Sequence, residues 1–451
     1  MPVDVKRNPT TPALAALVAA GLLAALPAGA GPGRPAPQRV EAGWTELPSG
    51  PLEARGFHTA VWTGREMLVW GGGSAGGLFD DGAAYDVASR SWTALPPAPL
   101  EGRTGHSAVW TGREMLLWGG CCARRGGEFG DGAAYDPGAG RWRRLPPAPI
   151  HARSAHTAVW TGEEMVVWGG LVFGRFFGDG AAYDPATRTW RRLAPAPVGP
   201  RASHTAVWTG QDVVVWGGTF EAEGLDDGAA YDPRRDRWRP TSEPPVTHRA
   251  GHTAVWTGEH MIVWGGCCDG GGHALGNGAA YDPGADGWTP LPAAPVGDRE
   301  DHAAVWTRGV MVVWGGRRGL DAYRGDGAAY LPGLDRWRPL APSPLAPRGG
   351  HTAVWTGREL LVWGGCCAEG GGAYGDGAAL TPAPRAAGGS PESAPPEGTP
   401  PSRTAGGRPP PGAERGVPWT ALAAALAAVA TLLGAAALQR RRRDRRQRSG
   451  G

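Results

Sequence analysis

Apolar runs and short polar turns alternate along this chain, and one apolar pattern returns seven times. The stretch HTAVWTGREMLVWGG starts at His58, and near copies start at six later histidines. The starting histidines lie 48 to 50 residues apart, which is a period typical of radial or solenoid repeats. The seven starts are His58, His106, His156, His204, His252, His302 and His351.

Each copy predicts four short strands. HTAVW is the first strand, a tight Thr-Gly turn follows, and the continuous apolar run EMLVW suits a second strand that is buried on both faces. After a variable glycine-rich loop, GDGAAYD predicts the third strand, and segments such as RWRRLP predict the fourth. Because no helical periodicity is present, seven units of four antiparallel strands predict an all-β propeller with seven blades.

The unit resembles the kelch repeat over residues 43–382. Paired glycines follow the second strand, a tyrosine lies about a dozen residues later, and a tryptophan lies seven residues beyond the tyrosine. An arginine also precedes each starting histidine by three positions. The resemblance implies blades that pack face to face around a central channel. These arginines are Arg55, Arg103, Arg153, Arg201, Arg249, Arg299 and Arg348.

The two ends of the repeat region complement each other. The seventh unit stops after GDGAALTP, so it lacks a fourth strand, and it carries Leu380 where a tyrosine is expected. A lone copy of the fourth strand, GWTELP at 43–48, precedes the first unit. We therefore expect this N-terminal strand to complete the last blade and close the ring, which removes a free sheet edge.

The segments outside the repeats predict targeting to a membrane. Residues 1–30 combine basic residues, a short apolar run and an AGA site, which is the pattern of a signal peptide. Residues 417–438 are long enough to cross a bilayer as a helix, and seven arginines in 439–451 predict a cytoplasmic C-terminus. Residues 383–416 are rich in proline and glycine and predict a semi-rigid stalk. We expect a single-pass cell-membrane protein with its propeller outside the cell.

Charge gives no support for a nucleic-acid partner. The formal net charge is +3, and the arginine-rich tail accounts for all of the excess. The remaining chain is mildly acidic, whereas proteins that bind nucleic acid concentrate basic residues in the folded domain.

Residues that every blade repeats are interpreted as structural, because each blade buries its faces only against its neighbours. The repeated histidines are expected to be hydrogen-bonding or ion-pairing struts, and the aspartate of GDG to be a turn residue. Function is expected in the loops after the paired glycines, which vary and lie on one face. One position in these loops predicts apolar anchors: Phe79, Phe129, Phe177, Leu225, Leu275, Tyr323 and Tyr374.

The charged and polar loop residues that do not repeat form the predicted ligand-binding face. Mixed charge around a channel mouth suits a polar ligand such as a glycan or an acidic peptide, and ordinary solvated loops are the alternative. The candidates are Arg124, Arg125, Glu128, Arg175, Glu221, Glu223, Asp269, His273, Arg317, Arg318 and Glu369.

Six cysteines form three adjacent pairs. Outside the cell they should be oxidised, and the pairs lie in blades 2, 5 and 7, which are not neighbours in the ring. Three vicinal disulfides are therefore predicted, with a thiolate cluster that binds a soft metal as the alternative. No Cys-x-x-Cys spacing supports zinc. The pairs are Cys121–Cys122, Cys267–Cys268 and Cys366–Cys367.

The sequence favours a binding scaffold over an enzyme. Kelch propellers include galactose-oxidase-like copper enzymes and sialic-acid epimerases, but His273 is the only unrepeated loop histidine here, and no nucleophile–base pair or phosphate-binding glycine motif is present. We therefore predict no cofactor, no metal and no catalytic residue, and we expect a cell-surface scaffold that binds a protein or a glycan. An extracytoplasmic carbohydrate-active enzyme is the alternative, because a fold alone cannot decide activity.

Overall fold

The computed structural model describes residues 43–382, except for 123–126, 222, 268–272, 320–321 and 368–371. The chain divides into two units after Val40, and every described residue belongs to the second unit. In the described part of the chain, no helix is long and apolar enough to cross a membrane. The predicted signal peptide, stalk, membrane span and tail, at 1–30, 383–416, 417–438 and 439–451, lie outside the described residues.

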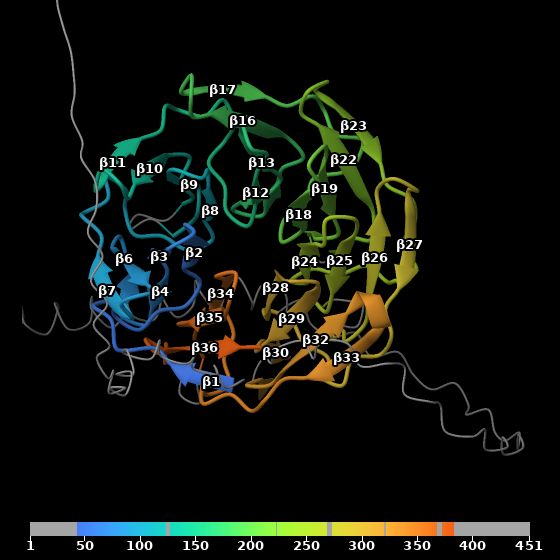
Figure 1. Ribbon diagram of the computed structural model, residues 1–451. Coiled ribbons are helices and arrows are strands. Elements are labelled where there is room, and N and C mark those ends of the chain that lie inside the picture. Colours follow the sequence, from blue (N-terminus) through green and yellow to red (C-terminus); the bar gives the residue numbers. More distant parts are fainter. Residues whose placement is uncertain are drawn as a thin grey trace, which may run out of the picture. The chain divides into compact units, whose positions relative to one another are not determined.

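Seven four-stranded antiparallel sheets form the blades of a closed propeller (Figure 1). This confirms the predicted all-β, seven-bladed fold. The first strands lie innermost, because they are the strands that contact their counterparts in both neighbouring blades. Blades 1 to 7 are numbered here by their first strands, which are β2 (Thr59–Trp62), β8 (Ser107–Trp110), β12 (Thr157–Trp160), β18 (Thr205–Trp208), β24 (Thr253–Trp256), β28 (Ala303–Thr307) and β34 (Thr352–Trp355).

The outer three strands of each blade follow in order from the channel to the rim. The second strands are β3 (Glu66–Trp70), β9 (Met115–Trp118), β13 (Met165–Trp168), β19 (Val213–Trp216), β25 (Met261–Trp264), β29 (Val310–Trp314) and β35 (Leu360–Trp363). The third strands are β6 (Gly82–Asp86), β10 (Gly132–Asp136), β16 (Gly180–Asp184), β22 (Gly228–Asp232), β26 (Gly278–Asp282), β32 (Gly327–Leu331) and β36 (Gly377–Thr381). The fourth strands are β7 (Ser91–Ala94), β11 (Arg141–Arg144), β17 (Thr189–Arg192), β23 (Arg237–Pro240), β27 (Gly287–Pro290), β33 (Arg336–Pro339) and β1 (Gly43–Glu46).

The N-terminal strand β1 closes the ring, as predicted. It pairs antiparallel with β36 in the last blade, with Trp44 opposite Leu380 (Figure 1). The indole of Trp44 also donates a hydrogen bond to the carbonyl of Ala341, 3.0 Å away, in the segment that follows blade 6. The other six fourth-strand tryptophans donate equivalent bonds to a carbonyl that lies next to the preceding blade. Closure therefore uses the same tryptophan hydrogen bond as the other six blade junctions.

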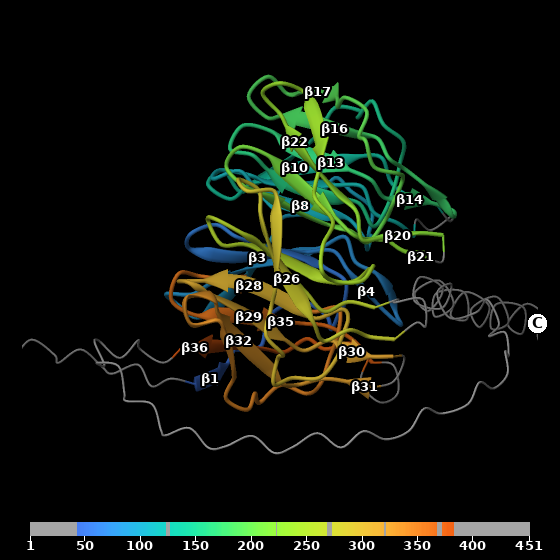
Figure 2. The ribbon, with the colours of Figure 1, turned by 90° about the vertical axis from the view of Figure 1, so that its right-hand side faces the viewer.

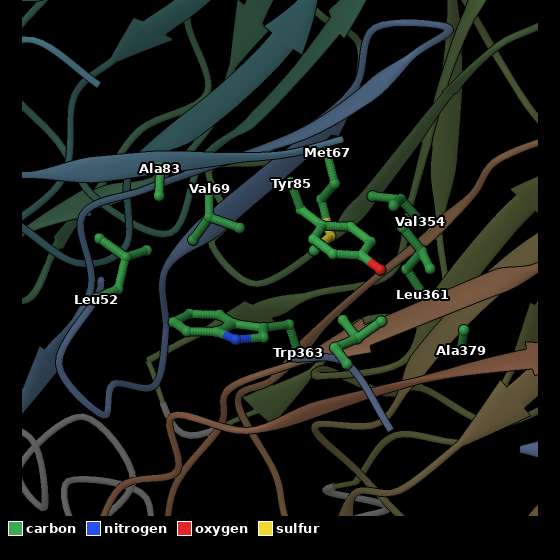
Figure 3. Packing of buried hydrophobic residues seen from close by; sticks show 10 residues of the cluster. Leu52, Met67, Val69, Ala83, Tyr85, Val354, Leu361, Trp363 and Ala379 are labelled. Atoms are coloured by element: carbon green, nitrogen blue, oxygen red, sulfur yellow. The ribbon is translucent and has the colours of Figure 1, made fainter. Parts of the chain in front are cut away.

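Apolar clusters fill the space between successive blades. At the junction of blades 7 and 1, Met67 and Tyr85 pack with Leu361 and Trp363 (Figure 3). The tryptophan that ends each second strand is at most 1% exposed in all seven blades. Because every junction buries the same side chains, the sequence must repeat them, and burial of each large side chain contributes roughly 1.5–3 kcal/mol.

The repeated histidines join each blade to the preceding one. In six junctions the histidine Nε2 lies 2.7–2.9 Å from the hydroxyl of a threonine or serine in the preceding blade. Each ring also packs edge-on against a second-strand tryptophan of that blade, with centroids 5.0–5.2 Å apart. The prediction that these histidines are structural hydrogen-bonding groups is confirmed in these six junctions.

The repeated arginines are buried and pair with the aspartate that immediately precedes the third strand, which is the aspartate of GDG in four blades and of DDG in two. Arg55, for example, is fully buried and binds the Asp81 carboxylate at 2.7 Å and the carbonyls of Glu53 and Gly71. Six blades contain this ion pair, at 2.7–3.0 Å. The prediction that this aspartate is a turn residue was wrong, because its carboxylate forms an ion pair with a buried guanidinium. A buried charge is costly unless a group of opposite charge pairs with it.

Blade 5 lacks this carboxylate and offers a test of the ion pair. Asn277 replaces the aspartate, Arg249 reaches its backbone carbonyl at 3.0 Å, and burial lowers the pKa of Arg249 to about 10. Asn277→Asp should stabilise the propeller by about 1–3 kcal/mol, because it supplies a charge-assisted hydrogen bond to a buried cation. Thermal melting measures the effect, and Asp376→Asn is the matched reverse change in blade 7. Equal melting temperatures for wild type and Asn277→Asp would contradict this account.

Candidate functional site

The loops after the paired glycines lie together on one side of the propeller, named here the loop face. Figure 2 shows their small hairpin strands on that side, which confirms the predicted placement. Bridges such as Gly56 to Gly73 also tie each of these loops to the segment before the first strand. The hairpin strands are β4 (Gly73–Ser74), β5 (Gly77–Leu78), β14 (Leu171–Val172), β15 (Arg175–Phe176), β20 (Thr219–Phe220), β21 (Glu223–Gly224), β30 (Arg317–Arg318) and β31 (Ala322–Tyr323).

A ring of seven residues surrounds the channel on the loop face and is named here the mouth ring. Each member immediately precedes a repeated histidine and has left-handed backbone, with φ of 51–62°. Several members donate a backbone hydrogen bond to the member in the preceding blade, such as Phe57 to Gly350 at 2.8 Å. Residues other than glycine rarely adopt this backbone. Four members, Phe57, Ala155, Ser203 and Asp301, nevertheless carry a side chain at this position. The members are Phe57, Gly105, Ala155, Ser203, Gly251, Asp301 and Gly350.

The channel contains a cavity of about 510 Å³. Apolar side chains from the first strands of blades 1 to 5 and 7 line this cavity. Apart from the indole N–H groups, these side chains are apolar. The cavity lining therefore offers packing surface and supplies no acid–base group.

Blade 6 places charged residues at the mouth. Arg317 binds the carboxylate of Asp301 at 2.8 Å and that of Glu300 at 3.5 Å, and its side chain is only 11% exposed. Burial, and secondarily the charge of Asp301, raises the pKa of Glu300 to about 7, whereas Arg317 acts in the opposite direction. The predicted anion-binding residue Arg317 thus already carries two internal carboxylate partners. Its neighbour Arg318 is 62% exposed and lies 3.9 Å from Asp298.

The apolar anchor of blade 6 differs from the prediction. The anchor backbone N–H bonds to the second paired glycine, and in blade 6 Arg324, not Tyr323, makes this bond, at 2.8 Å to Gly316. In four other blades the repeated arginine stacks on an aromatic anchor, 3.9–4.2 Å from the ring centroid. In the blade 6 loop the aromatic residue, Tyr323, lies one position before the residue that makes this bond. The prediction of Tyr323 as the anchor was therefore wrong.

Three phenylalanines on the loop hairpins of blades 3 and 4 were missed by the sequence interpretation. Phe173 is 79% exposed at the turn between β14 and β15, and Phe220 in β20 is also exposed. Phe176 in β15 lies 5.3 Å from Phe220 between ring centroids. We name Phe173, Phe176 and Phe220 the aromatic ridge. The phenylalanines of LVFGRFFG were the available signal, but only the fold shows which of them point outward.

The charged residues predicted for the ligand-binding face are distributed over several blades. Arg175, Glu221 and Glu223 are exposed beside the aromatic ridge, and His273 is exposed in blade 5. Glu128 lies under the neighbouring loop, where its carboxylate accepts a hydrogen bond from the Phe173 backbone at 3.4 Å, and burial raises its pKa. A binding role for these residues stays a prediction. Arg124, Arg125, Asp269 and Glu369 lie outside the described residues.

Two of the three predicted vicinal disulfides are described and confirmed. Cys121 and Cys122 are bonded, as are Cys366 and Cys367, each pair with Cα atoms 3.7 Å apart. The second cysteine of each pair has left-handed backbone, with φ of 79° and 82°. Cys267 is also disulfide-bonded, whereas Cys268 lies outside the described residues. The bridges lock a sharp reversal at the start of these loops.

Comparison with known proteins agrees with the blade architecture. Residues 57–246 and, one blade later, residues 105–292 match the family model described as the KLHDC2/KLHL20/DRC7 Kelch-repeats domain. Together the two matches span 57–292, which is more than half of the 451-residue chain. No curated protein matches the sequence. The repeat pattern, the seven-bladed ring and this match together show that the chain belongs to the kelch-repeat family.

Proposed function

We propose that this kelch propeller is a protein-interaction scaffold that is displayed at the cell surface and binds a protein partner through the aromatic ridge. The single observation that carries the proposal is the exposure of Phe173, which at 79% is the most exposed large apolar side chain of the described residues. Interface hot spots are enriched in aromatic side chains on rigid scaffolds.

The backbone at Phe173 supports a role in binding. Phe173 and Gly174 both have left-handed backbone, with φ of 45° and 80°, in the two-residue turn of the hairpin. Such turns favour asparagine and glycine, and a phenylalanine here costs roughly 1–2 kcal/mol of backbone strain. The phenylalanine gains little burial within its own chain in return. A partner that buries this side chain would recover its hydrophobic free energy.

Charged residues frame the aromatic ridge. Arg175 precedes Phe176 in β15, and Glu221 and Glu223 follow Phe220; all three are exposed. A desolvated aromatic centre with a polar rim is the usual anatomy of a protein interface. The predicted ligand-binding residues Arg175, Glu221 and Glu223 fit the rim of this surface.

Display at the cell surface is supported by the segments outside the propeller. The secretory pattern at 1–30, the apolar segment at 417–438 and the arginines after it favour an extracytoplasmic propeller with a cytoplasmic tail. The oxidised cysteine pairs fit the same side of the membrane. The stalk at 383–416 would separate the propeller from the bilayer.

The double variant Phe173→Ala with Phe220→Ala tests the proposal. A membrane-impermeant proximity label on intact cells identifies the partner, and calorimetry with purified proteins then measures its affinity. We expect the double variant to weaken binding by about 2 kcal/mol or more, because the anchors would leave the interface. Its melting temperature should stay unchanged, since both side chains are exposed.

Leu334→Ala is the matched control for lost apolar surface. Leu334 is 58% exposed in the 3-10 turn η1 (Pro332–Leu334), which joins a third strand to a fourth strand and so lies on the opposite face. This control should bind like the wild type. Equal affinity for the double variant and the wild type would rule out the ridge as the binding surface, and absence of external labelling would rule out surface display.

A further inference from the structure

Arginines on the fourth strands of blades 2, 3 and 4 link each of these blades to the next one. The guanidinium of Arg143 in β11 binds both carboxylate oxygens of Glu114, at 2.6 and 3.2 Å. It also donates a hydrogen bond to the hydroxyl of Tyr183 in blade 3, at 2.8 Å. Arg191 in blade 3 and Arg239 in blade 4 make the equivalent contacts with an acid of their own blade and a tyrosine of the next. A guanidinium therefore lies between a carboxylate and a tyrosine at three junctions.

The junction of blades 1 and 2 has the carboxylate and the tyrosine but not the arginine. Thr93 in β7 takes the place of the arginine in the sheet register. Glu66 and Tyr135 occupy the positions of the acid and the tyrosine. Within the described part of the chain, the Glu66 carboxylate forms no ion pair and the Tyr135 hydroxyl forms no hydrogen bond. Burial, and secondarily the charge of Glu66, raises the pKa of Tyr135, so the two groups interact without a cation between them.

A cavity of about 640 Å³ lies at this junction, and both Glu66 and Pro137 line it. Pro137 corresponds to Pro233 at the junction of blades 3 and 4, whose carbonyl oxygen lies 3.5 Å from the guanidinium of Arg191. The cavity thus adjoins two of the groups that surround the guanidinium elsewhere. Thr93 is exposed and Glu66 is half-buried, so solvent reaches the carboxylate. The space that an arginine fills at three other junctions is therefore open here.

The charges around the cavity favour a cation. Arg65 and Arg113 also line the cavity, but each is paired with an aspartate of its own blade, Asp86 at 2.7 Å and Asp136 at 3.5 Å. Among these groups Glu66 is the unpaired charge. In blade 2 an arginine at the position of Arg65 coexists with the guanidinium that is bound to the acid, so Arg65 does not exclude such a group.

We infer that this cavity binds a guanidinium group, which takes the place of the missing arginine between Glu66 and Tyr135. A carboxylate recognises a guanidinium through two parallel N–H···O bonds, which an ammonium group cannot reproduce. The three occupied junctions accommodate the group with donor–acceptor distances of 2.6–3.3 Å. The ligand is an arginine side chain of a peptide or a free guanidino compound, which share this chemistry.

The site is separate from the aromatic ridge. Its lining residues belong to turns that join first to second strands and third to fourth strands, whereas the loop face carries the connections from second to third strands. The inference therefore does not depend on the proposed function.

Two blocked tripeptides, Gly-Arg-Gly and Gly-citrulline-Gly, test the site on the purified full chain. Citrulline has nearly the shape of arginine but no charge, so the arginine tripeptide should bind at least about tenfold more tightly. NMR signals of the indole of Trp110, which lines the cavity, report binding. Glu66→Gln keeps the shape of the side chain and should weaken binding of the arginine tripeptide at least about tenfold. Tighter binding of the tripeptide than of free arginine supports a peptide ligand, and equal binding supports a free guanidino compound.

Thr93→Arg supplies the guanidinium from within the chain. It should raise the melting temperature and weaken binding of the arginine tripeptide at least about tenfold. Thr289→Arg is the matched control, because Thr289 has the same place in blade 5, where His260 replaces the acid. This control should bind the tripeptide like the wild type. Equal affinity for the two tripeptides, or undiminished binding in either Glu66→Gln or Thr93→Arg, would overturn the inference.

Discussion

Lowering the pH from neutral to about 5 should unfold the propeller in one cooperative transition. The cause is the set of seven repeated histidines, which are 5–8% exposed. Burial, and secondarily the guanidinium three residues earlier, lowers the pKa of five of them from 6.5 to about 3 and that of the other two well below 6.5. The folded state therefore holds all seven rings neutral where the unfolded chain would protonate them.

The direction of the effect follows from proton binding. The unfolded histidines take up protons below pH 6.5, whereas the folded ones do not until the pH approaches 3, so acid favours the unfolded state. Stability is fully present above pH 6.5 and falls as the pH drops from there. Each histidine contributes about 1.4 kcal/mol per pH unit, so seven together contribute about 10 kcal/mol per unit, comparable with the whole stability of a domain.

Urea titrations at several pH values measure this dependence through the free energy of unfolding. The wild type should show a slope that corresponds to about six protons between pH 6 and 5, approaching seven at lower pH. His204→Gln should lower the slope by about one proton, because it removes one buried neutral histidine. A propeller that stays folded at pH 4 with a flat profile would contradict the assignment of these histidines as buried neutral groups.

Deleting residues 43–48 should destabilise the propeller by more than about 4 kcal/mol. The deletion removes β1 from the last blade, including the hydrogen bond from Trp44 and the buried side chain of Leu47. It also leaves β36 as an open sheet edge, which promotes association between chains. Differential scanning calorimetry of the truncated propeller should show a markedly lower melting temperature and a tendency to aggregate.

Two comparisons sharpen this test. Trp44→Ala keeps the strand but removes its indole, so it should fall between wild type and truncation. The peptide GWTELP, added in excess to the truncated protein, should restore part of the lost stability by binding to β36. If the truncated and full propellers melt at the same temperature, closure by β1 contributes nothing and the seven-bladed ring does not depend on it.

The sequence by itself determined the architecture. Seven registered copies predict seven blades, and the lone GWTELP segment predicts closure, because strand count and sheet edges follow from pattern alone. The repeat also correctly indicated that the histidines are structural. It did not show that the aspartate before the third strand neutralises a buried arginine, since the two residues are 26 to 28 positions apart and meet only when the blade forms.

The candidate surfaces depended on the tertiary structure. The sequence ranks Arg317 and Arg318 alike as unrepeated loop charges, but only the fold places Arg317 between two carboxylates and leaves Arg318 exposed. The sequence likewise shows Ala303 as a minor change in the first strand. In the fold, Ala303 leaves His351, 48 residues later in the next blade, without the hydroxyl contact that the other six repeated histidines make, because the partner of each histidine is set by the packing of blades around the ring.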